Sequence, residues 1–172
     1  FLKAQNIDVK NSLVENDFLD VAKEILVLSE QHNCEIILPE DVVVAKNITD
    51  SHDVMVVPVR AVPDDYMILD IGPGAVNYIA EKLAQSKTVL WNGPLGAFEF
   101  RPFNIGSEAI ARHISLLTSQ GKVISIAGGG DVVASLKGSG LKNTLTYIST
   151  AGGAFLAWLE GKDLPGLAAL KK

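Results

Sequence analysis

Short apolar runs alternate with stretches of helical periodicity along most of this chain, and no other sequence feature restricts the possible folds as strongly. Phe18, Ala22 and Ile25, for example, recur at the spacing of one helix face. Runs such as Met67–Ile71 are too short for a helix and predict buried strands. Strands that alternate with helices form βαβ units. We therefore predict an α/β, Rossmann-like fold of three layers, with one mostly parallel sheet and helices on both of its faces.

Polar or glycine-rich turns separate the predicted elements. The predicted strands are Cys34–Leu38, Asp41–Ala45, Val54–Val59, Met67–Ile71, Lys87–Trp91, Lys122–Ala127 and Thr144–Ile148. The predicted helices are Glu15–Gln31, Ala75–Gln85, Gly106–Ser119, Asp131–Lys137 and Gly152–Leu159, and the tail Asp163–Lys172 is expected to be irregular. Because no linker, repeat or low-complexity tract interrupts the chain, we predict a single domain over residues 1–172.

Composition narrows the classes of function. The 172 residues carry 15 Lys and Arg against 20 Asp and Glu, a formal net charge of -5, which argues against nucleic acid as a partner. No apolar run is long enough to cross a bilayer and Phe1–Lys10 lacks the pattern of a secretory signal, so no membrane partner is expected. Cys34 is the only cysteine, which favours a reducing, cytoplasmic setting.

The local pattern that best predicts chemistry is a run of three glycines, Gly128 to Gly130, followed by Asp131 between a predicted strand and helix. Glycines let successive backbone N–H groups converge, and the helix adds its positive N-terminal end, so the turn suits a phosphate. Asp131 would repel a phosphate unless a cation intervenes, and Mg²⁺ held by one carboxylate and phosphate oxygens resolves the conflict. The alternative is structural, because Asp is a preferred N-cap residue and glycines form tight turns.

Three further turns, Asp70–Gly74, Asn92–Glu99 and Ser149–Gly153, follow predicted strands, at the sheet edge where α/β folds bind ligands. Ser149–Gly153 combines hydroxyls with glycines and suits a phosphate, although capping of the next helix is the commoner role of such a Ser–Thr pair. The rigid loop Asn92–Glu99 offers an amide at its start and a carboxylate that can accept from two vicinal hydroxyls. The alternative for this loop is a set of core aromatics with a solvated acid.

Two familiar nucleotide motifs fit poorly. The chain contains no G-x-x-x-x-G-K-[ST], which excludes a Walker-type P-loop. The dinucleotide fingerprint G-x-G-x-x-[GA] runs from Gly128 but has Val133 at its last position. Ser149 and Thr150 stand where an acid should meet the ribose. A nicotinamide-dependent dehydrogenase is therefore the weaker alternative.

Six segments, taken in order, closely resemble the phosphoglycerate kinase family. They are Ser12–Glu15, Leu38–Ala45, Asp70–Pro73, Trp91–Phe100, Gly128–Asp131 and Ser149–Gly153. The closing segment Leu159–Gly166 is similar to the C-terminal end of the family, so the resemblance covers nearly the whole chain. The W-N-G-P and G-G-G-D segments, at this separation, are its most specific parts.

The resemblance implies an enzyme that moves a phosphoryl group between 1,3-bisphosphoglycerate and ADP, with ATP/ADP and Mg²⁺ as cofactors. It also implies a monomeric, two-domain parent protein whose N-terminal domain binds 3-phosphoglycerate or 1,3-bisphosphoglycerate. This chain corresponds to most of the nucleotide-binding C-terminal domain, and the substrate domain and a lysine-containing segment that contacts the phosphates are expected to lie outside it. On its own the chain is expected to bind the Mg–nucleotide and to catalyse nothing.

The resemblance also implies a role for particular residues. On the adenosine side, Gly72 would lie near the adenine, Pro94 and Ala97 would pack against it, and Glu99 would bind the ribose hydroxyls. On the phosphate side, the implied contacts are Asn92, Gly128, Gly129, Gly130, Asp131 and the backbone N–H of Val132, with Asp131 as the Mg²⁺ ligand. The implied catalytic residues, near the transferring phosphoryl group, are Gly129, Gly130, Gly152 and Gly153. Three positions depart from the commoner residues of the family: Gly74, Val132 and Ala151.

Overall fold

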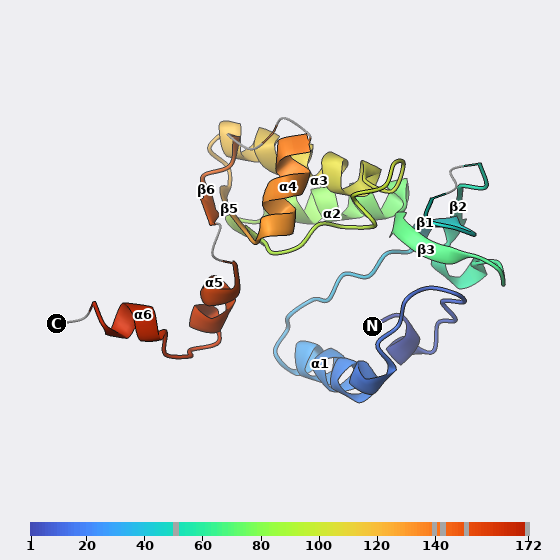
Figure 1. The fold of residues 1–172 in the computed structure, drawn as a ribbon, viewed down its shortest axis with the longest axis horizontal. Helices are drawn as coiled ribbons and strands as arrows, with labels where there is room; N and C mark the ends of the chain where they lie inside the picture. Colours follow the sequence, from blue (N-terminus) through green and yellow to red (C-terminus); the bar gives the residue numbers. More distant parts are fainter. Residues whose placement is uncertain (50–51, 139–140, 142–143, 150–151, 171–172) are drawn as a thin grey trace. The chain divides into compact units, whose positions relative to one another are not determined.

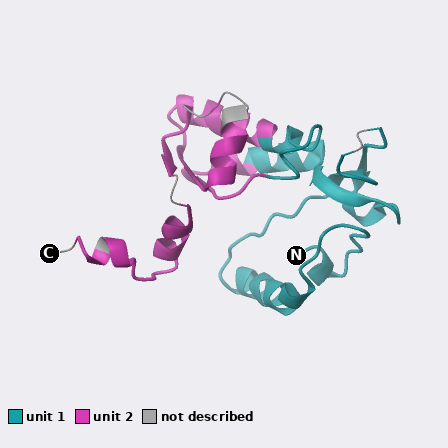
Figure 2. Cartoon of the chain, in the orientation of Figure 1, with its two compact units in different colours: residues 1–81, 95–107 teal, residues 82–94, 108–172 magenta. Residues whose placement is uncertain are grey.

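The computed structural model describes residues 1–49, 52–138, 141, 144–149 and 152–170 (Figure 1). Its contacts divide the chain into two compact units (Figure 2). Unit 1 comprises Phe1–Glu81 and Leu95–Ser107, and unit 2 comprises Lys82–Pro94 and Glu108–Lys172. The chain therefore passes from one unit to the other at three places along its sequence.

Unit 1 contains an antiparallel sheet of three strands in the order β2–β1–β3. The central strand β1 (Asp41–Ala45) pairs with β2 (Met55–Pro58) and with β3 (Met67–Ile71). Alternate residues of β1 point into a core of aliphatic side chains, which is why a valine-rich segment forms this strand. The core consists of two clusters: one is Ile7, Val42, Val44, Val59 and Val62, and the other is Ala45, Leu69 and Phe103.

The helices of this part of the chain differ in how many of their residues are buried. Single 3-10 turns form η1 (Lys3–Gln5), η2 (Asn16–Phe18) and η3 (Val59–Ala61). The helix α1 (Leu19–Gln31) contains no buried residue, whereas α2 (Pro73–Gln85) buries two small apolar side chains near its start.

The N-terminus of α2 is capped from β1. Pro73 occupies the first helical position, where its missing N–H costs nothing. The Asp41 carboxylate accepts hydrogen bonds from the backbone N–H groups of Gly74 (2.8 Å) and Ala75 (2.6 Å). A negative group at this end also complements the helix dipole, so Asp41 joins the start of α2 to the start of β1.

Unit 2 contains a parallel sheet of three strands in the order β4–β5–β6. The elements of this part of the chain are β4 (Thr88–Trp91), α3 (Ile105–Ser119), β5 (Ile124–Gly128), α4 (Gly130–Gly138), β6 (Tyr147–Ser149), α5 (Gly152–Leu159) and α6 (Pro165–Ala168). A helix follows β4 and another follows β5, as the crossover between parallel strands requires. The carboxyl ends of β5 and β6 consequently lie at one edge of the sheet.

The α/β class and its parallel sheet are confirmed, but the prediction that every strand joins one mostly parallel sheet is wrong for unit 1. Residues 46–54, between β1 and β2, hold no crossover helix among the residues described there. They are fewer than the roughly dozen residues that a parallel connection needs, so these strands pair antiparallel.

The predicted strand Cys34–Leu38 is also wrong. This apolar stretch runs from α1 to β1 without regular structure, and no described strand pairs with it (Figure 1). A strand needs a neighbour for its backbone N–H and C=O groups, and an apolar run alone does not supply one. Cys34–Leu38 is apolar as predicted, but none of the described strands forms backbone hydrogen bonds with it as a sheet neighbour.

The other predicted elements are present: β1, β3 and α5 have the predicted boundaries, and the remaining ones have shifted boundaries. The helix predicted from Glu15 divides into η2 and α1, the predicted strand Thr144–Ile148 becomes β6, and the tail predicted to be irregular contains α6. Thr150 and Ala151, which the sequence places in the second glycine turn, lie outside the described residues. None of the described helices is long and apolar enough to span a membrane.

Candidate functional site

The turn after β5 passes directly into α4. Gly129 has a φ of +103°, a conformation that L side chains rarely adopt, so the turn requires glycine here. Its N–H donates to the carbonyl oxygen of Ser149 in β6 (3.3 Å), and its own carbonyl accepts from the N–H of Val133 in α4 (3.2 Å). A Cβ built on Gly130 would meet nothing within 4 Å. The N-terminus of α4 therefore opens onto free space, where backbone N–H groups can receive an anion.

The second glycine turn touches the first. A Cβ built on Gly152, the first residue of α5, would lie 2.7 Å from both the N and the Cα of Gly129. A Cβ on Gly128 would lie 3.9 Å from the Cα of Gly152, whereas one on Gly153 would meet nothing within 4 Å. Gly152, at the start of α5, thus contacts the glycine turn after β5, and the two parallel strands that precede these glycines end at the same edge of the sheet.

Asp131 and Val132 occupy the first turn of α4 with opposite exposure. The Asp131 side chain is exposed, whereas Val132 is fully buried, backbone included, so the predicted contact of its N–H with a phosphate finds no open surface in the structure. Among the residues described, no three His, Cys, Asp or Glu side chains gather to hold a metal ion. Mg²⁺ at Asp131 would take its remaining ligands from phosphate oxygens and water, which is its common mode of binding.

Asn92 lies beside the same glycine turn. Its carbonyl oxygen is 3.6 Å from a Cβ built on Gly129, and its side chain is exposed. The preceding Trp91 is buried, and its indole N–H donates to the carbonyl of Gly93, which fixes the chain as it leaves β4. Pro94 is half-buried. Unit 2 therefore brings together Asn92, the glycines 128–130, Asp131 and Gly152.

Unit 1 carries three of the residues predicted for the adenosine side: Gly72 and, in the segment Leu95–Ser107, Ala97 and Glu99. The Ser107 hydroxyl accepts from the N–H of Leu95 (2.6 Å) and donates to its carbonyl (2.7 Å), which closes the segment into a loop. The N–H of Ala97 donates to the carbonyl of Leu69 in the middle of β3 (2.7 Å). Glu99 is exposed. The backbone of the loop is therefore fixed while its acid faces solvent.

A buried carboxylate, Asp70, lies under this loop. It is 2% exposed and accepts hydrogen bonds from the backbone N–H groups of Gly106 (2.8 Å) and Ile71 (2.8 Å). Burial raises the pKa of Asp70 to about 6, against the opposing effect of these two hydrogen bonds. The sequence analysis assigned Asp70 no role, although an acid at the carboxyl end of a buried strand was a signal for one.

Gly72 has a structural explanation beside its predicted role near the adenine. It is buried, and a Cβ built on it would lie 2.3 Å from the Asp41 carboxylate. A Cβ on Gly74 would lie 3.1 Å from the same carboxylate oxygens. Because position 74 is glycine rather than the commoner residue of the family, no side-chain atom crowds the Asp41 carboxylate that caps α2.

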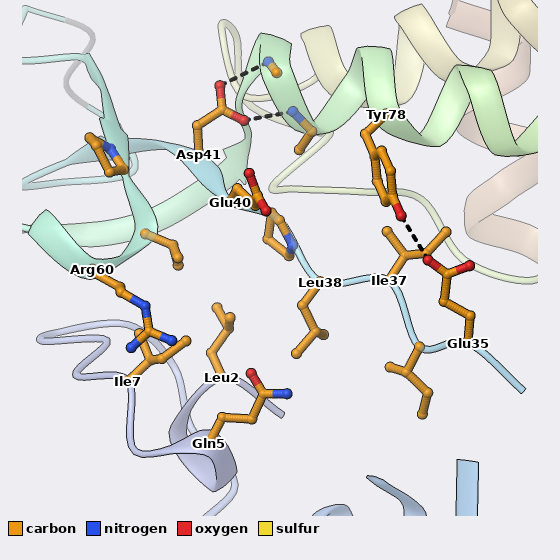
Figure 3. Close-up of a pocket in the computed structure, with 16 residues that line it drawn as sticks. Leu2, Gln5, Ile7, Glu35, Ile37, Leu38, Glu40, Asp41, Arg60 and Tyr78 are labelled. Carbon is orange, nitrogen blue, oxygen red and sulfur yellow. Dashed lines mark hydrogen bonds between the residues drawn. The ribbon is translucent and has the colours of Figure 1, made fainter. Parts of the chain in front are cut away.

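A groove of about 1030 Å³ in unit 1 does not coincide with the predicted site (Figure 3). The irregular stretch Glu35–Pro39 runs along it, and the Tyr78 hydroxyl donates to the Glu35 carboxylate across it (2.7 Å). None of the residues predicted to bind a nucleotide lines this groove. The groove is therefore not evidence for the nucleotide site.

These observations define an α/β protein in which two glycine turns meet at the carboxyl edge of a parallel sheet, with an acid in the first turn of the following helix. The family profile of phosphoglycerate kinase matches residues 1–162. The chain belongs to the phosphoglycerate kinase family. This membership confirms the resemblance seen in the sequence and removes the nicotinamide-dehydrogenase alternative.

Curated relatives share this assignment. A phosphoglycerate kinase of Ruegeria sp. (strain TM1040) is 52% identical over 171 residues, which are 99% of this chain and 43% of the relative. That of Azorhizobium caulinodans is 49% identical over 172 residues, 100% of this chain and 43% of the relative. The chain therefore spans less than half the length of these curated relatives.

Solved structures show the same fold. Phosphoglycerate kinase from Coxiella burnetii matches with a TM-score of 0.88 and 38% identity, covering 94% of this chain and 41% of that chain. Phosphoglycerate kinase from Pyrococcus horikoshii OT3 matches with a TM-score of 0.70 and 26% identity, covering 99% and 42%.

Proposed function

We propose that this chain supplies the Mg–nucleotide site of a phosphoglycerate kinase, an enzyme that transfers a phosphoryl group between 1,3-bisphosphoglycerate and ADP. The observation that carries the proposal is the contact of Gly152 with Gly129 at the ends of two parallel strands, beside the exposed Asp131. Membership of the family supplies the reaction class. The open N-terminus of α4 supplies an anion site, because the first N–H groups of a helix have no partner within the helix and the helix dipole favours negative charge there.

The phosphate side of the proposed site consists mainly of backbone groups. Phosphoryl transfer needs alignment and neutralisation of charge more than covalent help. Gly128, Gly129 and Gly130 line the phosphate chain with Asn92, while Gly152 and Gly153 approach the transferring phosphoryl group. Asp131 holds Mg²⁺, which when bound neutralises charge on the phosphate oxygens.

The adenosine side of the proposed site uses residues of the loop and of the neighbouring strand end. Glu99 accepts hydrogen bonds from the two ribose hydroxyls, a role that its exposed side chain permits. Ala97 and Pro94 provide the surface against which the base packs, and Gly72 lies near the base. Support for Ala97 comes from its hydrogen bond to β3, which fixes its position.

We further propose that the chain has no kinase activity alone. The acceptor pocket for 3-phosphoglycerate or 1,3-bisphosphoglycerate belongs to the remaining length of a monomeric, cytoplasmic parent protein, since this chain covers 43% of its relatives. A coupled assay with 1,3-bisphosphoglycerate and MgADP is therefore expected to show no ATP formation by the isolated chain. Turnover above the buffer control would overturn this part of the proposal.

The direct test is a calorimetric titration of the chain with ADP, with and without Mg²⁺. We expect magnesium-dependent binding that becomes roughly tenfold weaker in Asp131→Asn, because the variant loses one charged Mg²⁺ ligand, about 1.4 kcal/mol. Without Mg²⁺ the two proteins should bind ADP with similar affinity, since only the cation links the carboxylate to the phosphates.

Asp20→Asn is the matched control for this titration. Asp20 is an exposed acid in the first turn of α1, so its substitution makes the same charge change at the start of a helix in unit 1. Its affinity for MgADP should equal that of the parent chain. Equal weakening in both variants, or the same loss with and without Mg²⁺, would place the cation elsewhere.

A further inference from the structure

The buried carboxylate of Asp70 joins three parts of unit 1. Asp70 lies near the end of β3, one carboxylate oxygen accepts from the next backbone N–H along the strand, and the other accepts from the N–H of Gly106 near the start of α3. The third part is the loop between Gly96 and Gly106. A negative group at the first turn of a helix is favoured by the dipole, which offsets part of the cost of burying the charge.

The loop is shaped around this carboxylate. A Cβ on Gly96 would lie 2.5 Å from an Asp70 carboxylate oxygen, and a Cβ on Gly106 would lie 2.4 Å from the same oxygen. Gly96 also has a φ of +65°. Both ends of the loop therefore approach the carboxylate more closely than any residue with a side chain could.

Ala97 and Glu99 lie between these two glycines. The N–H of Ala97 donates to the carbonyl of Leu69, the residue that precedes Asp70. The position of both loop residues thus depends on how the loop is held against β3. Asp70 itself is 2% exposed, so it acts on a ligand only through the loop.

We propose that Asp70 is a positioning residue whose carboxylate holds the loop Gly96–Gly106 in the conformation in which Ala97 and Glu99 contact the adenosine part of a nucleotide. This role rests on the adenosine side of the proposed function. It assigns a task to a buried acid that the phosphate chemistry does not use.

The first arm of the test measures the loop without any nucleotide. Asp70→Asn keeps the shape of the side chain but replaces one acceptor oxygen by an amide, so only one of the two backbone N–H groups keeps its partner. Amide hydrogen exchange at Ala97 and Gly106 should accelerate roughly tenfold or more. Exchange at Ile124, whose N–H donates to Lys87 in unit 2, should not change.

The second arm compares two probes, MgADP and magnesium pyrophosphate. Pyrophosphate has no adenosine, so it depends only on the phosphate side. Asp70→Asn should bind ADP roughly tenfold more weakly, the size expected for a lost charged hydrogen bond, and should bind pyrophosphate like the parent. Adding Glu99→Ala should weaken ADP binding in the parent and change it little in Asp70→Asn, because the loop is already displaced.

Val44→Ala is the control for general destabilisation, since Val44 is fully buried in the other core cluster of unit 1. It should leave the ratio of ADP to pyrophosphate affinity unchanged. Asp70→Ser, which is smaller and neutral, provides a second variant should the isosteric one not fold.

Three results would overturn the proposal. These are unchanged loop exchange in Asp70→Asn, an equal loss of ADP and pyrophosphate affinity, or the same shift of the affinity ratio in Val44→Ala. A parent chain that binds pyrophosphate but not ADP would instead contradict the adenosine side of the proposed function. Faster loop exchange would then leave Asp70 with a structural role alone.

Discussion

Replacing Gly152 by alanine is expected to lower the free energy of unfolding by about 3 kcal/mol, the upper part of the usual range for overpacking. The new methyl group would lie 2.7 Å from backbone atoms of Gly129, and backbone cannot rotate away as a flexible side chain can. Gly129 is itself held at a φ of +103° with its N–H on Ser149. The turn can therefore relieve the overlap only by moving off β6.

Gly153→Ala is the matched control, because Gly153 is the next residue of α5 and has open space at its Cβ position. Here the expected change has the opposite sign, a gain of about 0.5 kcal/mol, since alanine favours a helix over glycine. Urea unfolding of both variants, followed by circular dichroism, measures the difference. Similar midpoints for the two variants would show that the glycine turns are not in contact.

Asp70 should make the free energy of unfolding fall as the pH rises. This is the opposite of the effect of an acid whose pKa is lowered by a hydrogen bond, such as Asp20. Burial raises the pKa of Asp70 from its ordinary value of 3.8 to about 6. Between these values the folded chain binds more protons than the unfolded chain, so the free energy of unfolding falls as the pH rises. The contribution is about 3 kcal/mol, lost between roughly pH 4 and pH 6.

Urea unfolding of the parent and of Asp70→Asn at several pH values between 4 and 7 isolates this contribution. The free energy of the parent minus that of the variant should fall by about 3 kcal/mol across the interval. Asp8 and Asp20, whose pKa values are lowered by hydrogen bonds to Lys10 and Lys23, titrate below this interval in both proteins and cancel. Parallel curves for the two proteins would mean that Asp70 titrates as an ordinary acid.

The local sequence pattern was sufficient to predict individual strands, helices and turns. The strand β3, the helix α2 and the glycine turn after β5 each follow from apolar spacing or from glycines at a strand end. The direction of strand pairing was not predictable in this way for β1 and β2. It depends on the connection between them, which is too short for a crossover.

The candidate site, too, was predictable only in part from the sequence. The sequence predicted that the glycine turns would lie together, because neighbouring parallel strands end at one edge. It did not predict that Gly72 and Gly96 each face a carboxylate, Asp41 and Asp70, that leaves no room for a side chain. Such contacts join residues far apart in the chain, and glycine patterns do not reveal which atom fills the vacant place.

The interleaved order of the two units affects how a nascent chain can fold. Phe103, fully buried with Ala45 and Leu69, is synthesised only after β4 of unit 2. When β4 leaves the ribosome, β5, the strand that pairs with it, has not yet been made. The first strand pairing open to the growing chain is therefore that of β1 with β2. Unit 1 therefore gains the core contact of Phe103 only after the first segment of unit 2 has been synthesised, so the synthesis of unit 1 is not complete before that of unit 2 begins.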